Sequence, residues 1–280
     1  MTLKTLLSLR NNPRPLVMGI LNVTPDSFSD GGRHDAPDAA LSHARKLIAD
    51  GADVLDIGGE STRPGSDPVS AALETDRVAP VIEALAREWD GVISIDTMKP
   101  EVARVAVAAG ATVWNDVSAL QYAPDSLSTA AELGCEVILM HMRGNPKTMQ
   151  DAPSYEDVVA EVCQDLSAQA MSALAAGGKP ENIWLDPGIG FAKNLDHNLA
   201  LTANLRAICD LGYPVLYAAS RKRMIGEIDP SATHASDRLG GTVALHLEGV
   251  CQGAAMVRVH DVREMVQALK VQAAINGARA

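Results

Sequence analysis

The sequence predicts a single (β/α)8 TIM barrel, a parallel eight-stranded barrel enclosed by helices. The domain would cover residues 1–280, with its core at about residues 15–275. Three observations support this: one strand-like junction recurs, strands and helices alternate without a linker, and the apolar residues are aliphatic. Hydrophobic residues make up 47% of the chain and aromatic residues 3%. A core of Ala, Val, Leu and Ile suits a parallel sheet that is buried on both faces.

The recurring junction is a helix that ends in glycine, followed by a small residue, an apolar run and a polar residue. It begins at Gly51, Gly110, Gly134 and Gly253, and in a looser form at Leu211. Glycine after a helix end supplies the left-handed conformation, and the short apolar run that follows predicts a buried parallel strand. With the apolar runs at residues 16–21, 92–95 and 183–185, these junctions predict eight strands.

Helical patterns lie between the predicted strands. The first recurs at helical spacing over residues 40–48, behind Pro37, and Gly51 closes it. Ser154 and Asp157 indicate a capping box before the apolar stripe at residues 158–166. A doubly wound open sheet is the alternative fold, but it would show a GxGxxG turn after the first strand, and the sequence has none.

Composition excludes several classes of function. The chain has 24 Lys and Arg against 35 Asp and Glu, a net charge of −11, and no basic stripe, so we expect no nucleic-acid partner. The four cysteines form no CxxC pair and predict neither a zinc site nor a disulfide framework. No apolar run approaches the roughly 20 residues that span a bilayer, and residues 1–15 lack a signal-peptide core. We therefore expect a cytoplasmic protein without a membrane partner.

Polar residues close every predicted strand, and three long loops rich in Gly, Pro, Ser and Asp follow strands at residues 22–35, 60–70 and 142–153. Active sites of this fold lie at the carboxyl ends of the strands. A single polar residue there could simply cap the next helix, and Asp56 and Asp116 could be structural. In strand order the closing residues are Asn22, Asp56, Asp96, Asn115 with Asp116, His141, Asp186, residues 220–222, and Arg258 with His260.

The charges at these strand ends fall into two groups. The seventh and eighth strands are followed by cations, which would favour a phosphate or diphosphate; these are Arg221, Lys222, Arg223, Arg258 and His260. The earlier Asp96, Asn115 and Asp186 would suit a nitrogen-rich heterocycle, because a carboxylate can accept two adjacent N–H groups. No carboxylates cluster near Asn22, so a Mg²⁺ held mainly by diphosphate and water fits better than a protein cage.

Seven segments, in this order, strongly resemble the dihydropteroate synthase family, which joins a pterin diphosphate to 4-aminobenzoate in folate biosynthesis. A single segment would be a weak signal, but all seven in register across residues 16–260 are specific. They are GILNVTPDSFSDGG at 19–32, DIGGESTRPG at 56–65, SIDT at 94–97, WND at 114–116, DPGIGF at 186–191, SRK at 220–222 and RVH at 258–260.

The resemblance implies a role for each matching residue. Asn22 would coordinate Mg²⁺ on the diphosphate, which Arg258, His260 and Thr62 would hold. The pterin would be bound by Asp96, Asn115, Asp186 and Lys222. The reaction is expected to develop carbocation character at the pterin methylene as diphosphate leaves, and the catalytic residues would be Asp96, Lys222, Arg258 and His260. It also implies a homodimer formed through late helices.

The 4-aminobenzoate site is expected in the loops. The two phenylalanines of the chain, Phe28 and Phe191, both fall in motif loops and could serve only to anchor them. Alternatively they form an apolar wall for the benzoate ring, and ordering of residues 22–35 and 60–70 by diphosphate would then complete this site last. The full expected set is Phe28, Thr62, Arg63, Pro64, Phe191, Lys222 and Arg223.

Two positions depart from the family pattern. Ala218 stands where members commonly have Gly, and its methyl group could crowd the pterin. Arg223 stands where many have Ser, so either its guanidinium or helix amides could receive the benzoate carboxylate. Because no insertion follows Arg63 and Pro64, we expect ordinary sulfonamide sensitivity.

Three other functions share parts of this pattern. A pterin-binding methyltransferase with a corrinoid partner would have no use for the Arg258, His260 and Lys222 arrangement. A Schiff-base aldolase would use Lys222 as its nucleophile. An inactive synthase-like subunit would be expected to have lost some strand-end residues, and this chain keeps them all.

Overall fold

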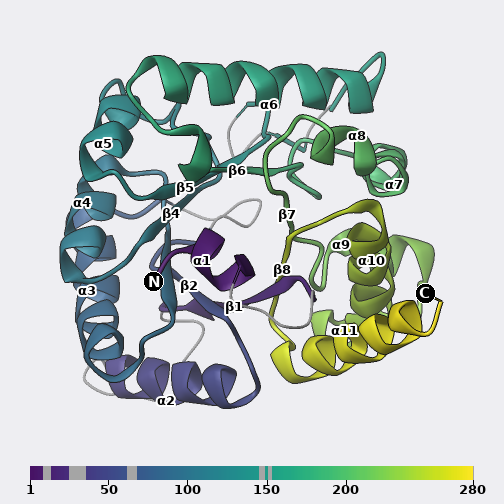
Figure 1. Cartoon of the computed structure of the whole chain (residues 1–280), viewed down its shortest axis with the longest axis horizontal. Helices are drawn as coiled ribbons and strands as arrows, with labels where there is room; N and C mark the ends of the chain where they lie inside the picture. Colours follow the sequence, from purple (N-terminus) through teal and green to yellow (C-terminus); the bar gives the residue numbers. More distant parts are fainter. Residues whose placement is uncertain (9–13, 25–35, 62–67, 145–148, 151–152, 280) are drawn as a thin grey trace.

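A computed structural model describes residues 1–8, 14–24, 36–61, 68–144, 149–150 and 153–279 of the chain. These residues form one parallel barrel with helices around it (Figure 1). The strands pair in the order β6-β5-β4-β3-β2-β1-β8-β7. A parallel bridge between Leu185 and Val215 joins the two ends of this order, and the Leu185 amide donates a hydrogen bond to the Pro214 carbonyl (3.0 Å). The predicted eight-stranded barrel is confirmed.

All eight predicted strands are present. They are β1 (Leu16–Asn22), β2 (Val54–Gly58), β3 (Val92–Asp96), β4 (Val113–Asp116), β5 (Glu136–Met140), β6 (Ile183–Asp186), β7 (Leu216–Tyr217) and β8 (Met256–Val259). The junction glycines Gly51, Gly110, Gly134 and Gly253 have positive φ, as predicted. At Gly110 a side chain is also excluded by packing, because a Cβ there would lie 2.5 Å from the Cβ of Ala86.

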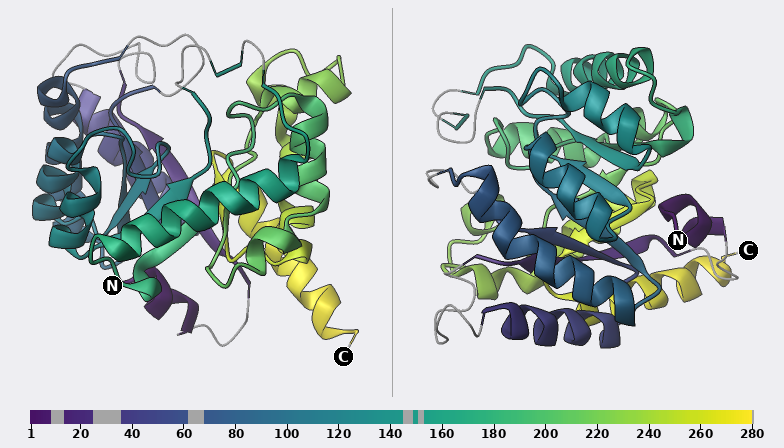
Figure 2. Two further views of the ribbon diagram at one scale, coloured as in Figure 1. Left: turned by 90° about the horizontal axis from the view of Figure 1, so that it is seen from above. Right: turned by 90° about the vertical axis from the view of Figure 1, so that its left-hand side faces the viewer.

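Helices cover the outside of the strands on all sides (Figure 2). The α-helices are α1 (Leu3–Ser8), α2 (Ala36–Ala49), α3 (Ala71–Glu88), α4 (Pro100–Ala109), α5 (Ser126–Leu133), α6 (Val158–Ala175), α7 (Leu195–Ala203), α8 (Arg206–Cys209), α9 (Arg223–Ile228), α10 (Leu239–Gln252) and α11 (Val262–Gly277), with short 3-10 turns η2 (Pro180–Asn182) and η3 (Ala235–Arg238). No helix of the described segments combines the length and apolarity needed to cross a bilayer.

The cap of α6 differs from the prediction. Asp157, and not Ser154, is the N-cap, and its carboxylate accepts the amides of Val159 and Ala160 (3.0 and 3.1 Å). Glu161 accepts the amides of Glu156 and Asp157 (2.7 and 3.0 Å). The capping box predicted at Ser154 was therefore placed three residues too early.

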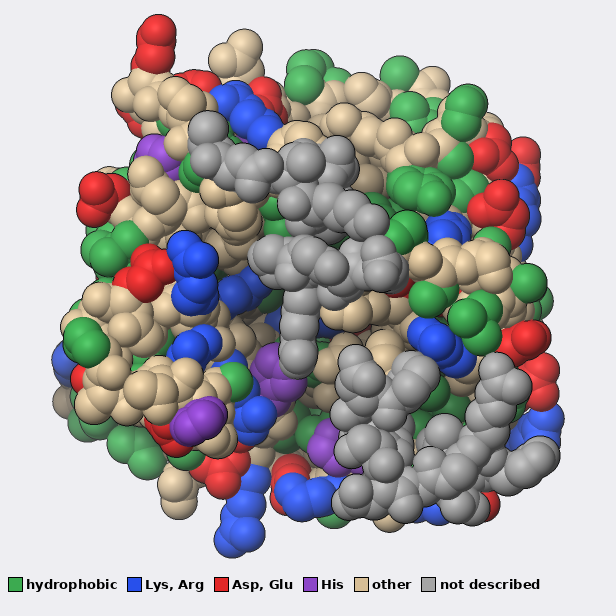
Figure 3. All heavy atoms as spheres, turned by 180° about the vertical axis from the view of Figure 1, so that it is seen from behind, with side chains coloured by type: hydrophobic (Ala, Val, Ile, Leu, Met, Phe, Trp, Pro, Cys, Tyr) green, Lys and Arg blue, Asp and Glu red, His purple; other side chains and the backbone are tan. Residues whose placement is uncertain are grey.

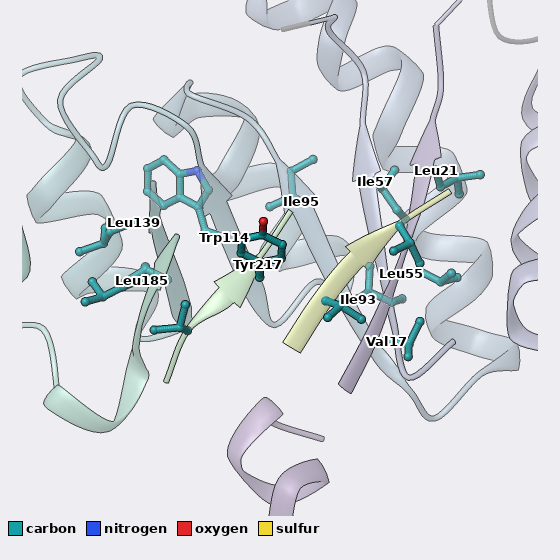
Figure 4. Packing of buried hydrophobic residues seen from close by; sticks show 14 of the residues in the cluster. Val17, Leu21, Leu55, Ile57, Ile93, Ile95, Trp114, Leu139, Leu185 and Tyr217 are labelled. Carbon is teal, nitrogen blue, oxygen red and sulfur yellow. The ribbon is translucent and has the colours of Figure 1, made fainter. Parts of the chain in front are cut away.

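The apolar core has two layers, because successive residues of a strand point to opposite faces. The outer layer lies between strands and helices and includes Val17, Leu55, Trp114 and Leu185 (Figure 4). The inner layer lies inside the barrel at the amino ends of the strands, where Leu3 of α1 packs among side chains from all eight strands. These inner residues are Leu16, Met18, Val54, Val92, Val113, Ile138, Trp184, Leu216 and Met256.

Candidate active site

The alternation along each strand decides which of its polar residues enters the barrel. Val54 belongs to the inner layer and Leu55 to the outer one, so Asp56 points inward. The same argument applies to every strand, and the inward set at the carboxyl ends comprises Asn22, Asp56, Asp96, Asn115, Asp186, Ser220, Arg258 and His260. On the face opposite to α1, Lys, Arg and His side chains gather around a central hollow (Figure 3).

Arg258 lies at the centre of this set. Its Nε donates to Asp56 Oδ2 (2.6 Å) and its Nη2 donates to Asp96 Oδ2 (2.7 Å). Asn115 Nδ2 donates to the same Asp56 oxygen (3.0 Å). Residues from β2, β3, β4 and β8 are thereby joined in one hydrogen-bonded group. Arg258, which was expected to face the diphosphate, uses two of its nitrogens on carboxylates of the barrel interior.

Two carboxylate oxygens of this group are acceptors without a donor. Asp56 Oδ1 and Asp96 Oδ1 are buried and have no hydrogen-bond partner among the described residues. Burial raises the pKa of Asp96, and the positive charge of Arg258 opposes that rise only in part. A buried acceptor without a donor is costly, so these oxygens suit a ligand that brings N–H groups into the barrel.

Asp186, at the end of β6, and Lys222, after β7, interact through their opposite charges. Gly188 donates its amide to Asp186 Oδ1 (2.7 Å), and burial raises the pKa of this carboxyl to about 6. Lys222 Nζ lies 4.3 Å from the centre of the Phe191 ring, within the range of a cation–π contact. Burial lowers the pKa of Lys222 to about 8, although Asp186 acts in the opposite direction.

The segment after β7 alternates in the same way. Ser220 points inward, and its Oγ lies 2.9 Å from His260 Nδ1 and accepts the His260 amide (3.2 Å). Arg221 has φ of 56° and turns outward, where Nε and Nη2 bind both oxygens of Asp261 (2.9 and 2.5 Å). Ala218 lies on the inward side between Leu216 and Ser220, where its predicted effect on a pterin remains a prediction.

Several expected site residues are elsewhere. Arg223 opens α9 with its side chain 83% exposed, and its Nε binds Glu227 Oε1 (2.7 Å). Its guanidinium is therefore not directed into the barrel. Phe28, Thr62, Arg63 and Pro64 lie outside the described residues, so their expected roles remain predictions.

Two strand-end residues point away from the barrel interior: Asp116, which the sequence already suggested could be structural, and His141, which was expected to face inward. Asp116 follows Asn115 and points outward, where it accepts the amides of Ser118 and Leu120 (2.7 and 2.8 Å) and shapes the turn after β4. His141 also points outward, and its Nε2 lies 3.1 Å from Asp165 of α6. Asp56, in contrast, points into the barrel, where it accepts from Arg258 and Asn115, and its even spacing from the inward Val54 indicates this orientation from the sequence.

Asn22 closes β1 on the inward side and is half-buried. Among the described residues, no group of three His, Cys, Asp or Glu side chains is placed to hold a metal ion. One partly accessible amide oxygen matches a Mg²⁺ whose other ligands are oxygens of substrate and water. The donor set therefore fits the expected ion.

The comparisons with known proteins agree with this geometry. A family model described as "Pterin binding enzyme" matches residues 18–260. The dihydropteroate synthase of Escherichia coli (strain K12) is 49% identical over 257 residues, which cover 92% of this chain and 90% of that protein. The chain belongs to the dihydropteroate synthase family. Its members are transferases of folate biosynthesis, and this chain is one of them.

Solved structures of dihydropteroate synthases are also similar in fold. The Xanthomonas albilineans enzyme with 4-aminobenzoic acid has a TM-score of 0.89 and 49% identity, covering 94% of this chain and 93% of that one. The same enzyme in complex with 7,8-dihydropteroate has a TM-score of 0.86 and 46% identity, with 94% of each chain covered. The Yersinia pestis enzyme in a sulfonamide drug complex has a TM-score of 0.89 and 45% identity, covering 94% and 95%.

Proposed function

We propose that this transferase condenses (7,8-dihydropterin-6-yl)methyl diphosphate with 4-aminobenzoate, giving 7,8-dihydropteroate and diphosphate. The observation that carries the proposal is the buried group in which Arg258 joins Asp56 and Asp96 beside Asn115. This group offers carboxylate and amide oxygens to a heterocycle. Arg258, together with Lys222 and His260 near the ends of β7 and β8, offers positive charge to a diphosphate. The relatives that bind 4-aminobenzoic acid and 7,8-dihydropteroate support the same substrates.

The pterin is bound by the carboxylates and amide of the interior. Asp96 Oδ1, buried and without a donor among the described side chains, accepts a ring N–H, and Asp186 accepts the adjacent N–H groups of the aminopyrimidine. Asn115 contributes its amide oxygen, because its nitrogen is used on Asp56. Lys222 donates to a pterin acceptor from above the Phe191 ring.

In the reaction, the bond between the pterin methylene carbon and the diphosphate oxygen breaks, and a bond from that carbon to the aniline nitrogen forms. Asp96 stabilises the positive charge that develops on the pterin as the bond breaks. Arg258 and His260 stabilise the departing diphosphate, and His260 is oriented by Ser220. The proton lost from the amine passes to solvent, so no strong base is needed.

Mg²⁺ would be held by Asn22 together with oxygens of the diphosphate and water. When bound, it supplies positive charge that lowers the cost of diphosphate departure. Thr62 of the neighbouring loop would join Arg258 and His260 on the diphosphate.

The 4-aminobenzoate is proposed to lie against the Phe191 ring, with its carboxylate near Lys222. Phe28, Arg63 and Pro64 would complete the apolar wall. The Arg223 guanidinium pairs with Glu227 at the surface. Arg223 would therefore contact the benzoate carboxylate through its backbone amide at the start of α9.

We further propose that the protein acts in the cytoplasm as a homodimer. Ile228 of α9 and Val271 and Ile275 of α11 are 57%, 55% and 50% exposed, which is compatible with an interface through late helices. Light scattering at micromolar concentration would test this, and a monomeric mass would contradict it.

The function is tested by incubating the purified chain with dihydropterin-methyl diphosphate, with and without 4-aminobenzoate and Mg²⁺. We expect release of diphosphate together with equimolar dihydropteroate only when all components are present. A chain that binds the pterin but forms no dihydropteroate would contradict the proposal.

Sulfonamides carry an aniline like that of 4-aminobenzoate, so they should compete with it and leave the KM for the pterin diphosphate unchanged. Initial rates at several 4-aminobenzoate concentrations would show a competitive pattern. Activity that is indifferent to sulfonamides would contradict the proposed aminobenzoate site.

A further inference from the structure

A buried lysine outside the barrel interior lies directly behind this site. Lys193 stands between β6 and α7, seven residues after Asp186 ends β6, and it is only 3% exposed. We propose that Lys193 is a positioning residue of the synthase reaction: its ammonium group fixes the loop after β6, so that Phe191 and Asp186 face Lys222. This inference rests on the proposed function and deepens it.

The ammonium group has an acceptor for each of its three protons. Lys193 Nζ lies 2.9 Å from His141 Nδ1, 2.9 Å from the Phe191 carbonyl oxygen and 3.4 Å from the His141 carbonyl oxygen. One buried cation thereby joins the end of β5 to the loop that follows β6. The bond to the Phe191 carbonyl holds the backbone of the residue whose ring contacts Lys222.

His141 is arranged to accept from this lysine. Burial and the charge of Lys193 lower the pKa of His141 to about 4, so the imidazole is neutral near pH 7. Its Nε2 lies 3.1 Å from Asp165 Oδ2, which also accepts from Nε and Nη2 of Arg143 (3.1 and 2.8 Å). A carboxylate only accepts hydrogen bonds, so the imidazole proton is on Nε2, and Nδ1 accepts a hydrogen bond from the Lys193 ammonium group.

The loop leaves little room for another conformation. A Cβ on Gly188 would lie 2.0 Å from the His141 carbonyl oxygen, and a Cβ on Gly190 would lie 3.1 Å from Lys222 Cδ. Ala192 has a positive φ of 51°, and its carbonyl accepts the Tyr155 hydroxyl (3.0 Å). The loop is thus packed between His141 on one side and Lys222 on the other, and Lys193 is the cation that binds it to β5.

The same cation acts on Asp186 through charge. The groups that face this carboxylate are Lys222, Arg258 and Lys193, with the Tyr217 hydroxyl on β7. Lys193 in turn faces Asp186, Lys222, Arg143 and Asp165. Burial lowers the pKa of Lys193 to about 7, so it is charged in the acidic range where Asp186 titrates. Removing it would raise the pKa of Asp186.

The test compares Lys193→Met, which removes charge and hydrogen bonds, with Lys193→Gln, which keeps a donor for Phe191 but no charge. Lys179→Met, at an exposed lysine before η2, is the matched control. Calorimetric titration with the dihydropterin-methyl diphosphate gives pterin affinity against pH. Steady-state rates give kcat and the KM for 4-aminobenzoate.

Pterin affinity should fall at low pH as Asp186 takes up a proton, and we call this fall the acidic limb. In both Lys193 variants we expect the midpoint of the acidic limb to move to higher pH by about half a unit or more. The KM for 4-aminobenzoate should rise roughly tenfold in Lys193→Met, more than in Lys193→Gln, with a smaller change in kcat. Lys179→Met should behave as the unaltered chain does. If Lys193→Met does not fold, the position of the acidic limb in Lys193→Gln tests the proposal.

An acidic limb that stays in place in a folded Lys193 variant would overturn the proposal, because a residue that only packs would not move the titration of Asp186. Failure of the proposed function is a separate result. It would appear as an unaltered chain that forms no dihydropteroate, while the pterin titrations could still be compared among the variants.

Discussion

Arg258 is the residue through which the charges of the barrel interior are coupled. Its guanidinium binds carboxylates from β2 and β3, so the position of Asp96 depends on a cation supplied by β8. A ligand that donates to the free oxygen of Asp96 therefore meets an acceptor whose orientation is already fixed. Such preorganisation is what lets an electrostatic group stabilise a developing charge.

Asp96→Asn tests this at the level of a single residue. We expect kcat to fall by roughly 10²–10³, the usual cost of one preorganised electrostatic contact, because the amide cannot stabilise the pterin cation. Affinity for the pterin diphosphate should change much less, since Asn115, Asp186 and Lys222 remain. Single-turnover rates and calorimetry separate the two effects. A loss of affinity with an unchanged single-turnover rate at saturating substrate would indicate that Asp96 serves binding alone.

His246 gives a prediction for pH and stability. It is fully buried in α10, its Nδ1 donates to the Thr242 carbonyl (2.7 Å), and its Nε2 accepts the Ala219 amide (3.3 Å). Burial lowers the pKa of His246 to about 4. A lowered histidine pKa stabilises the fold above the unfolded value near 6.5, and this stability is lost as pH falls toward 4, at about 1.4 kcal/mol per pH unit.

Urea unfolding at pH 7.5, 6, 5.5 and 5 would measure this loss. His246→Asn keeps a donor toward Thr242 and cannot titrate, so its unfolding free energy should fall less steeply below pH 6.5. His141 contributes to the slope of both proteins and cancels in the difference. Parallel slopes for the two proteins would refute the assignment.

At the residue scale, the direction of many interior side chains could be predicted from the sequence. Successive residues of a strand point to opposite faces, so the direction of one apolar residue gives the direction of the others. Asp96, Asn115, Asp186 and Arg258 lie inward as their motifs suggested. The partners could not be predicted in the same way. Nothing local in the sequence shows that Arg258 binds Asp56, more than two hundred residues earlier, or that Lys193, in the loop after β6, binds His141 at the end of the neighbouring strand β5.

Among the elements, α3 and α4 are joined to the start of the second loop by a buried ion cluster. Lys99, the N-cap residue of α4, has its Nζ against Glu74 Oε2 of α3 (2.6 Å) and against Glu60, just after β2. Burial raises the pKa of Glu74, and Lys99 opposes that rise. The cluster holds Glu60, the second residue after β2, against α3 and the start of α4.

Lys99→Met should reduce the free energy of unfolding by about 3–5 kcal/mol, because it leaves two carboxylates buried without a cation. Glu60→Gln is the matched control and should cost less, since Lys99 and Glu74 still pair. Urea denaturation at pH 8 and pH 5 measures both. The loss in Lys99→Met should be smaller at pH 5, where Glu74 can take up a proton. A change of under about 1 kcal/mol at pH 8 would contradict this account.

Element boundaries were predictable where backbone conformation demanded a particular residue. The junction glycines mark helix ends correctly, because few other residues adopt a positive φ. The apolar stripe marked the start of α6 at Val158, but the cap was assigned to Ser154, because both Ser154 and Asp157 carry a side-chain oxygen that can cap a helix and only Asp157 accepts the first amides of α6.

At the scale of the whole molecule, the barrel has a polar end and an apolar end. The α1 helix closes the apolar end, where Leu3 is fully buried and the Leu3 and Lys4 amides donate to Glu136 (2.7 and 3.4 Å). Figure 1 shows α1 lying across the strands at this end. The contacts of α1 that cover the apolar end therefore lie apart from the active-site residues at the polar end.

Deletion of residues 1–8 should lower stability and leave the active site unchanged. Loss of the buried Leu3 alone should cost about 1.5–3 kcal/mol, or several degrees in Tm. Trp184, 1% exposed beneath α1, should become accessible, which shifts its fluorescence to longer wavelength. Calorimetry, emission spectra and kcat at 25 °C would show this pattern. A large loss of kcat in a folded truncated protein would contradict it.

The position of α1 also bears on the order of events during synthesis. This helix precedes all eight strands in the chain, yet the surface that buries Leu3 includes Met256 of β8. A ribosome delivers the helix first and its binding surface last, so α1 can dock only after the final strand has emerged and closed the ring. Burial of Leu3 would thus mark the completion of folding on the ribosome.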